Sequence, residues 1–165
     1  MATGTLALGP SKPLDTSPIL TPCAPDLLCQ GESGTRYSGV YRRIELRACT
    51  AIHLQQVRAR ELWLEDSIAS AEDLWLGESS QPPEVALKLD RSSLVLTAAE
   101  VRGQTAVELS DARLDIAGVR LKGEVQGLSV QGASRLVASF SELRLGQQRR
   151  FLHFSEKLEK GSLKP

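Results

Sequence analysis

Short alternating runs of apolar and polar residues begin at Tyr37 and continue through most of the chain. A period of two with polar partners is typical of strands that are wetted on one face. The clearest runs cover 44–48, 85–89, 94–96, 107–109, 114–116, 119–121 and 128–130. This pattern predicts a mainly β protein.

The phase of the alternation changes twice between 114 and 130. The apolar pairs at 114/116 and 128/130 fall on even positions, whereas the pair at 119/121 falls on odd ones. Glycines lie near these changes, where a bulge or tight turn favours a residue without Cβ strain. They are Gly118, Gly123, Gly127 and Gly132. The sequence therefore predicts short strands with glycine corners between 85 and 132.

Two architectures are compatible with this pattern. The first is a strongly curved antiparallel sheet of short strands with one or two short helices. The alternative is a β-solenoid, in which each coil stacks on the last and buries a thin ladder of Leu, Val and Ile. A solenoid is expected to show a fixed period, and the intervals between the apolar pairs do not repeat. We therefore favour the curved antiparallel sheet.

Helical spacing occurs in a few places. Between 66 and 75 the residues Ile68, Ala71 and Trp75 follow a three-then-four spacing, which is typical of one helix face. A similar spacing is found between 136 and 143, where strand-like alternation fits equally well. The segment 151–158 is compatible with a further helix.

Residues 1–35 differ in composition from the rest of the chain. They hold five of the eight prolines, mixed with Ser, Thr and Gly, and show little periodicity. Such a segment buries too little apolar surface to offset its ordering entropy. We predict a flexible Pro-rich arm over 1–35 and a single β-rich domain over 36–165, a size that suits one core.

Charge and composition exclude some partners. Twenty basic residues balance twenty acidic ones, so the chain has no global field to attract nucleic acid. Aromatic residues make up 4%, too few for a base-stacking platform. There is no run long enough for a membrane span, and the first ten residues lack the basic and apolar regions of a signal peptide. We expect no nucleic-acid partner and favour the cytoplasmic side.

The cysteines do not predict a metal site. Cys23, Cys29, Cys49 and His53 have intervening gaps of five, nineteen and three residues, and the first gap does not match a zinc knuckle. An odd cysteine count without a signal peptide favours reduced thiols. Cys49, beside an alternating run, is expected to be a small buried hydrophobic residue.

Catalytic motifs are lacking as well. His53 and His153 are far apart in the sequence, and neither has a local nucleophile and carboxylate around it. Neither a nucleophile elbow nor a phosphate-binding loop occurs. The sequence predicts that the protein is not an enzyme and needs no cofactor.

Charge is distributed unevenly along the chain. Six arginines and Glu45 lie between 36 and 60, and seven carboxylates without a basic residue lie between 61 and 84. Either the two segments neutralise each other across strands, or the arginines form a face for phosphate or carboxylate groups, including lipid headgroups.

The arginine-rich run supplies the candidate binding residues. With Ile44, Leu46 and Ala48 directed inward, the intervening side chains point outward and leave a net positive strip. Trp63 alternates out of phase with its leucine neighbours, so it either contacts a partner or lies in a strand buried on both faces. The candidates are Arg42, Arg43, Arg47 and Trp63.

Three stretches together resemble the LmeA-like phospholipid-binding family. They are Ser-Gly-Val-Tyr-Arg-Arg-Ile-Glu-Leu-Arg-Ala at 38–48, the Leu- and Arg-rich run at 52–66, and Ser-Leu-Val-Leu-Thr-Ala-Ala-Glu-Val at 93–101. In the last of these, Glu100 stands at the family's acidic position. The resemblance implies a curved sheet backed by helices that holds lipid without chemistry.

These observations predict a non-catalytic binding domain that accepts a lipid or another apolar ligand on a curved β sheet. The partner would then be a lipid or a membrane surface. The alternative is a protein-interaction or scaffold subunit of a larger assembly, which docks through its sheet edges, its acidic segment or the arm.

Overall fold

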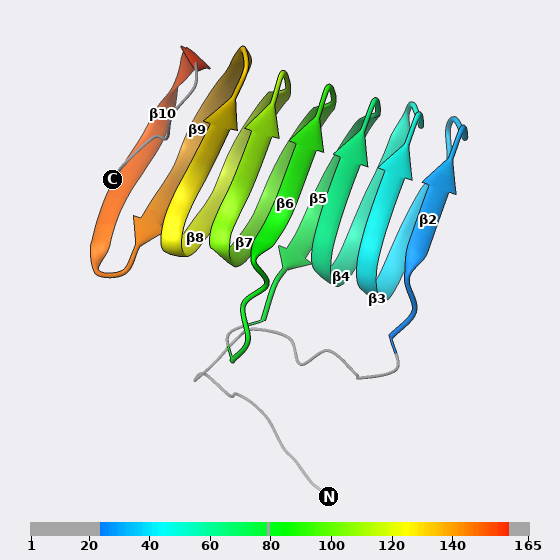
Figure 1. Cartoon of the computed structure of the whole chain (residues 1–165), viewed down its shortest axis with the longest axis horizontal. Helices are drawn as coiled ribbons and strands as arrows, with labels where there is room; N and C mark the ends of the chain where they lie inside the picture. Colours follow the sequence, from blue (N-terminus) through cyan, green and yellow to red (C-terminus); the bar gives the residue numbers. More distant parts are fainter. Residues whose placement is uncertain (1–23, 79, 159–165) are drawn as a thin grey trace, which may run out of the picture.

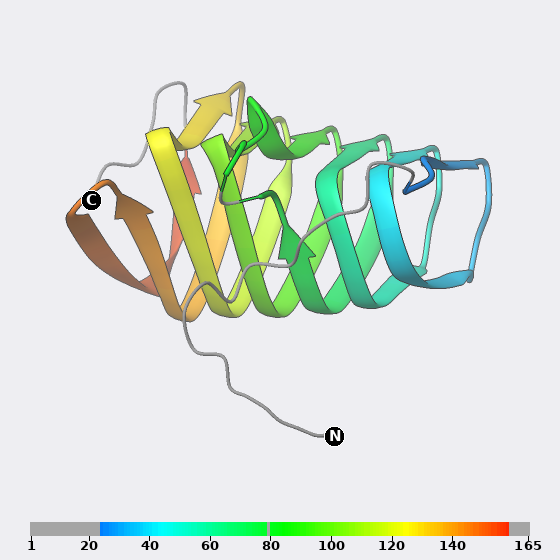
Figure 2. The ribbon, with the colours of Figure 1, turned by 90° about the horizontal axis from the view of Figure 1, so that it is seen from below.

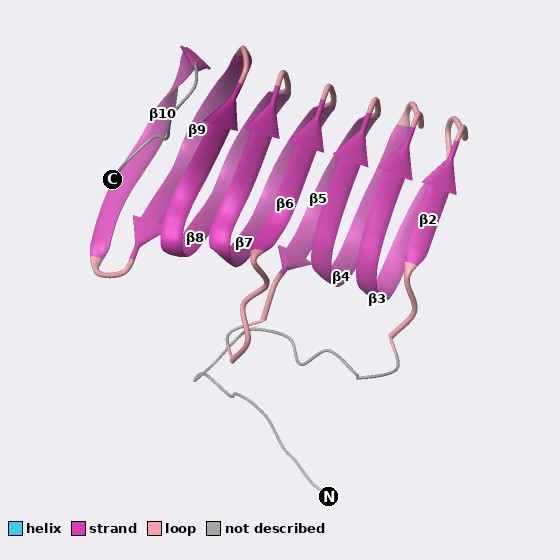
Figure 3. Ribbon diagram, viewed as in Figure 1, coloured by secondary structure: helices cyan, strands magenta, loops and turns pink. Residues whose placement is uncertain are grey.

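Coils of β-strand are stacked side by side along the length of the molecule (Figure 1). The computed structural model describes residues 24–78 and 80–158, which form nine strands and no helix (Figure 3). The strands are β2 (Leu27–Gln30), β3 (Arg36–Arg47), β4 (Ile52–Glu65), β5 (Ile68–Leu76), β6 (Val85–Asp90), β7 (Ser93–Ser110), β8 (Arg113–Gln131), β9 (Ser134–Leu145) and β10 (Gln148–Leu158).

Neighbouring strands are parallel from β2 through β9, and among the strands that the structure describes only the β9–β10 pair is antiparallel. β6 lies between β4 and β7 and completes the coil that β5 begins. The ribbon seen from below follows the chain around successive coils (Figure 2). The mainly β prediction is confirmed and the β-solenoid alternative fits, whereas the favoured antiparallel sheet with short helices is wrong.

Two columns of left-handed backbone bend each coil. Both columns consist of residues with φ between 47° and 68°, a conformation that bends a strand sharply. The first column is Gly31, Ala48, Asp66, Arg91, Asp111 and Gly132. The second is Gln56, Asp73, Ala98, Gly118 and Phe140. Because most of these residues are not glycine, the stacking of coils sustains a conformation that their side chains disfavour.

The corners explain why some segments resembled helices. In β5 the buried residues are Ala69, Ala71, Leu74 and Leu76, with the corner residue Asp73 shifting the alternation by one position. The extra residue creates a spacing of three within a strand. Residues 68–75, 136–143 and 151–158 accordingly belong to β5, β9 and β10, and 66–67 lie at the bend before β5, so none of these segments is a helix.

Unequal coil lengths hide the repeat. Leu27 pairs with Ile44, seventeen residues later, whereas Leu62 pairs with Leu87 after twenty-five, because the longer coil includes the segment 77–84. Later coils return after twenty to twenty-two residues. Backbone pairing tolerates this variation because the extra residues lie at the corners.

Stacked ladders of side chains fill the interior. Leu62, Leu87, Val107 and Leu128 lie in register on one side of the coils, and all are fully buried. On the other sides, small and large residues alternate between β5 and β7. Ala69 and Ala71 are paired with Leu94 and Leu96, and Leu74 and Leu76 with Ala99 and Val101. This alternation keeps the volume of each layer nearly constant, as close packing requires.

The predicted arm overlaps the solenoid. Residues 1–23 lie outside the described residues, but β2 falls within 1–35 and forms the first rung, pairing with β3. Ala48, predicted to point inward, is instead an exposed corner residue.

Buried serines satisfy backbone groups at the first corner. The N–H of Cys49 donates to Ser67 Oγ at 3.1 Å, and the N–H of Ser67 donates to Ser92 Oγ at 3.0 Å. The Ser92 hydroxyl in turn donates to the carbonyl of Asp90 at 2.8 Å. Each hydroxyl therefore replaces a backbone acceptor that the turning chain does not offer.

We predict that Ser92→Ala lowers the free energy of unfolding by about 1–3 kcal/mol, because it leaves the buried N–H of Ser67 without an acceptor. Urea denaturation followed by circular dichroism measures the change. Ser93→Ala is the control, since that hydroxyl is half-buried and not part of the chain of hydrogen bonds; it should stay within about 0.5 kcal/mol of the wild type. Equal losses in both variants would contradict this role.

Candidate binding surfaces

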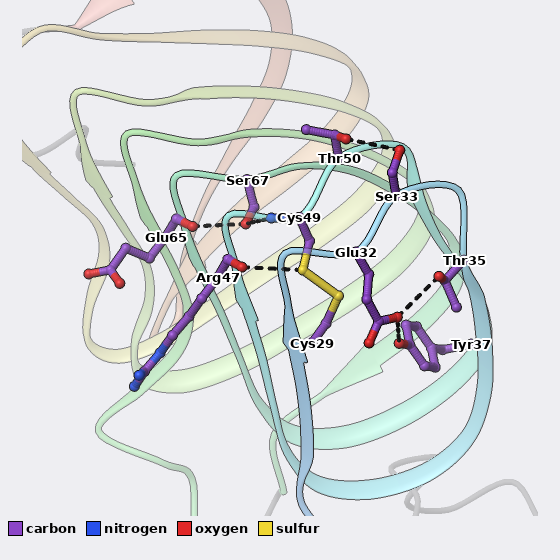
Figure 4. Close-up of a disulfide and its surroundings, with 10 residues drawn as sticks. All are labelled: Cys29, Glu32, Ser33, Thr35, Tyr37, Arg47, Cys49, Thr50, Glu65 and Ser67. Atoms are coloured by element: carbon purple, nitrogen blue, oxygen red, sulfur yellow. Dashed lines mark hydrogen bonds between the residues drawn. A yellow bond between two sulfur atoms is a disulfide. The ribbon is translucent and has the colours of Figure 1, made fainter.

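A disulfide closes the first coil (Figure 4). Cys29 in β2 is bonded to Cys49 at the following corner, and both residues are fully buried. The prediction of reduced thiols is therefore wrong for these two cysteines, although the burial of Cys49 is as expected. The residues are twenty apart in sequence, and only the return of the chain through β3 brings them together. Cys23 lies outside the described residues.

A small polar cluster lies beside the disulfide (Figure 4). The Tyr37 hydroxyl donates to Glu32 Oε1 at 2.7 Å, and Thr35 donates to the same oxygen at 3.1 Å. The hydrogen bond to the Glu32 carboxylate raises the pKa of Tyr37, and burial adds to this effect. The cluster thereby fixes the turn that leads from β2 into β3.

The predicted arginine strip faces outward but is matched by carboxylates. Arg43 Nε donates to Glu61 at 3.0 Å, while Glu45 accepts from Arg43 at 3.3 Å and from Arg47 at 2.8 Å. Arg42 pairs separately with Asp26. Burial by itself lowers the pKa of Arg43, but its bonds to Glu61 and Glu45 outweigh this effect and raise the pKa. Two carboxylates thus offset the two arginines of the strip.

Trp63 lies on the same outer face, and its neighbours Leu62 and Leu64 point into the core. The Arg43 guanidinium is 4.0 Å from the centre of its ring and Lys88 Nζ is 5.2 Å away. A hollow of about 200 Å³ opens here, between Trp63 and charged residues of β3, β4 and β6. Stacking with cations from both neighbouring strands therefore accounts for the half-buried indole.

The acidic segment 61–84 is largely paired with arginines. Asp73 meets Arg58 at 3.3 Å, Glu78 meets Arg60 at 3.7 Å, and Arg91 reaches Asp66 at 2.8 Å. The hydrogen bond from Arg91 lowers the pKa of Asp66. Stacking of coils brings these partners together from positions that are 15 to 25 residues apart.

A hollow of about 430 Å³ runs across the first corner column. Arg91, Arg113 and Arg135 line it together with Asp111 and several serines. Arg113 is already held by both oxygens of Asp115, at 2.9 and 3.2 Å. The hollow therefore has little excess charge, because two of its arginines, Arg91 and Arg113, are already hydrogen-bonded to carboxylates.

Sequence reasoning missed two surfaces in the last coils. One is a row of basic residues on β7, β8, β9 and β10, namely Arg102, Lys122, Arg144 and Arg149. Their spacing along the sequence follows the varying coil length and therefore forms no fixed repeat. The other is at the C-terminal end, where Phe140 and Phe151 are exposed and the ring of Phe140 lies against that of His153. The signal for the second was present, since all three phenylalanines of the chain fall after residue 139.

The two histidines lie on different strands and are not brought together. His53 on β4 has its Nδ1 at 2.9 Å from Ser70 Oγ, and His153 on β10 lies with its ring centre 5.0 Å from that of Phe140. Within residues 24–78 and 80–158, no group of three or more His, Cys, Asp or Glu side chains could hold a metal ion. The same residues include no helix able to cross a membrane.

Comparison with known proteins gives no relatives: no family model, no curated protein and no solved structure matches the chain. The resemblance to the LmeA-like family therefore stays a prediction.

We predict that removing the disulfide loosens β2 and leaves the central coils intact. Cys29→Ala with Cys49→Ala should lower the free energy of unfolding by about 3 kcal/mol, the value expected for a loop of this size. Hydrogen exchange followed by mass spectrometry should find faster exchange in β2 but not in β7 or β8. The double variant and the reference protein that keeps the disulfide should both carry Cys23→Ser, so that exchange with a third thiol does not affect the comparison. Unchanged exchange in β2 would contradict the prediction.

Proposed function

We propose that this protein is a non-catalytic interaction scaffold that associates through its C-terminal end, with a second copy of the chain as its partner. The observation that carries the proposal is the strand β10. Among the described residues it pairs only with β9, so one edge of an eleven-residue strand is open. Open edges of this kind are templates for pairing with another strand.

Exposed aromatic side chains accompany the open edge. Phe140 and Phe151 are 74% and 66% exposed, the two most exposed phenylalanines of the described residues. The ring of Phe140 also packs at a tilt against that of His153 of β10. Apolar side chains grouped in this way at the end of a domain favour a protein contact.

A second copy suits this edge for two reasons. An antiparallel pair of identical edges is self-complementary under a two-fold axis, since each strand supplies the donors and acceptors that the other needs. The net charge of zero, with a pI near 6.7, adds no long-range repulsion between copies.

Binding of an apolar ligand on a curved sheet draws less support from the same structure. The alternating leucines that suggested an apolar face lie in the closed core. Charged residues line the hollow beside Arg91 and the hollow beside Trp63. The protein-interaction alternative therefore becomes the proposal.

Sedimentation velocity over a range of protein concentrations tests the association. We expect the full chain to form dimers and Phe140→Ser with Phe151→Ser to shift the protein to monomers, because the apolar part of the contact is lost. Ile68→Ser with Val95→Ser is the matched control: these residues are also exposed, at 56% and 47%, but lie on β5 and β7. The control should dimerise normally. A monomeric wild type, or equal loss in both variants, would overturn the proposal.

A further inference from the structure

We infer that the outer face of β7, β8 and β9, with the start of β10, binds phosphate groups through a row of basic residues. This cation row consists of Arg102, Lys122, Arg144 and Arg149. The backbone register places Arg102 opposite Lys122, Lys122 opposite Arg144, and Arg144 opposite Arg149. The inference goes beyond the proposed function, because it concerns the face of the solenoid and not the open edge of β10.

Four like charges in direct register repel one another. Adjacent strands are about 4.8 Å apart, and like charges directly opposite each other destabilise a sheet. The neighbouring row supplies Glu100, Arg120 and Glu142, which lie beside the cation row. Arg120 raises the number of cations on this face to five. With Glu124 at the adjoining corner, the carboxylates number three. The face therefore keeps a positive excess in the folded protein.

Glu100 is the anchor of this arrangement. Its side chain is only 9% exposed, and it lies 3.3 Å from Lys122, 3.8 Å from Arg102 and 3.9 Å from Arg120. Its Oε2 atom has no hydrogen-bond partner among the described residues. One buried carboxylate thus holds three cations in place without using up their donors.

The cations of this face differ from Arg43 and Arg113 in how their N–H donors are used. Arg144 and Arg149 approach Glu142 only to 3.8 and 3.6 Å, and Arg102 and Arg120 approach Glu100 only to 3.8 and 3.9 Å. None of these four arginines makes a side-chain hydrogen bond within the described part of the chain, and Lys122 Nζ lies 3.3 Å from Glu100. By contrast, Arg43 and Arg113 donate to carboxylates at 2.9 to 3.3 Å. The cation row is fixed in position and still has donors to offer.

Phosphate is the ligand chemistry that this surface suits best. A guanidinium offers a planar fork of donors that binds phosphate through two oxygens, and an ammonium adds a compact point charge. A doubly charged phosphate neutralises more of the excess than a carboxylate does. The phosphate groups come either from a soluble polyphosphate or from the headgroups of anionic phospholipids.

The experiment has one arm for each source, and both use the full chain. Titration calorimetry with sodium tripolyphosphate measures binding of the soluble form. Co-sedimentation with phosphatidylcholine vesicles, with and without phosphatidic acid, measures binding to headgroups. We expect binding in at least one arm, and weaker binding as salt rises, because screening shortens the range of the attraction.

Paired variants locate the site. Arg144→Gln with Arg149→Gln should weaken binding at least tenfold, and Arg120→Gln with Lys122→Gln should act in the same direction. Arg43→Gln with Arg47→Gln is the matched control, which removes two charges from the hydrogen-bonded strip and should change affinity less than twofold. Thermal unfolding of each variant checks that it is folded, and the Arg144 and Arg149 pair avoids disturbing buried Glu100.

Three outcomes would overturn the inference: no binding in either arm, loss of binding in the Arg43 and Arg47 control alone, or binding that all the variants retain. Sedimentation of the same variants keeps this result separate from the proposed association. Failure of phosphate binding in a protein that still dimerises would count against the cation row only.

Discussion

Parallel, in-register stacking of coils is the interaction on which this structure depends. A single coil has a thin line of apolar residues and cannot bury it alone, so its stability comes from the coils on either side. Leu64, Leu89 and Leu109, for example, form a continuous ladder whose members are each fully buried. Backbone hydrogen bonds along the same direction hold the ladder in register. The left-handed corners persist for the same reason, because an unbent chain would lose pairing with both neighbours.

A stacked architecture has two ends where this interaction stops. At the N-terminal end, β2 covers only part of the next coil, and the bond between Cys29 and Cys49 fastens it. At the C-terminal end the chain reverses, and antiparallel β10 covers β9. Within the described residues, this arrangement leaves one edge of β10 unpaired, and the exposed Phe140 of β9 and Phe151 of β10 belong to the same end. The two ends are therefore chemically different, which explains why we assign association to only one of them.

On the outer faces, stacking places charged side chains of successive coils beside one another. Over the first coils the partners are close, as in the contacts of Arg43 with Glu61 and of Arg91 with Asp66. Over the last coils, cations meet cations, and the remaining carboxylates lie 3.3 to 3.9 Å from them. Arg43 and Arg91 donate hydrogen bonds to carboxylates, whereas Arg102 and Arg144 make no side-chain hydrogen bond within the described residues, so the last face retains donors for a ligand.

The sequence by itself determined the strand-rich character, most of the buried positions and the places where the alternation slips. Gly118 and Gly132, flagged from those slips, are corner residues with positive φ. It could not determine parallel pairing, since strand direction depends on where the chain returns, and coils of unequal length leave no fixed period. The disulfide, the pairing of Arg43 with Glu61 and the alignment of Arg102 with Lys122 were decided only by the tertiary structure. Each joins residues about twenty positions apart, and only the stacking of coils brings such residues within contact distance.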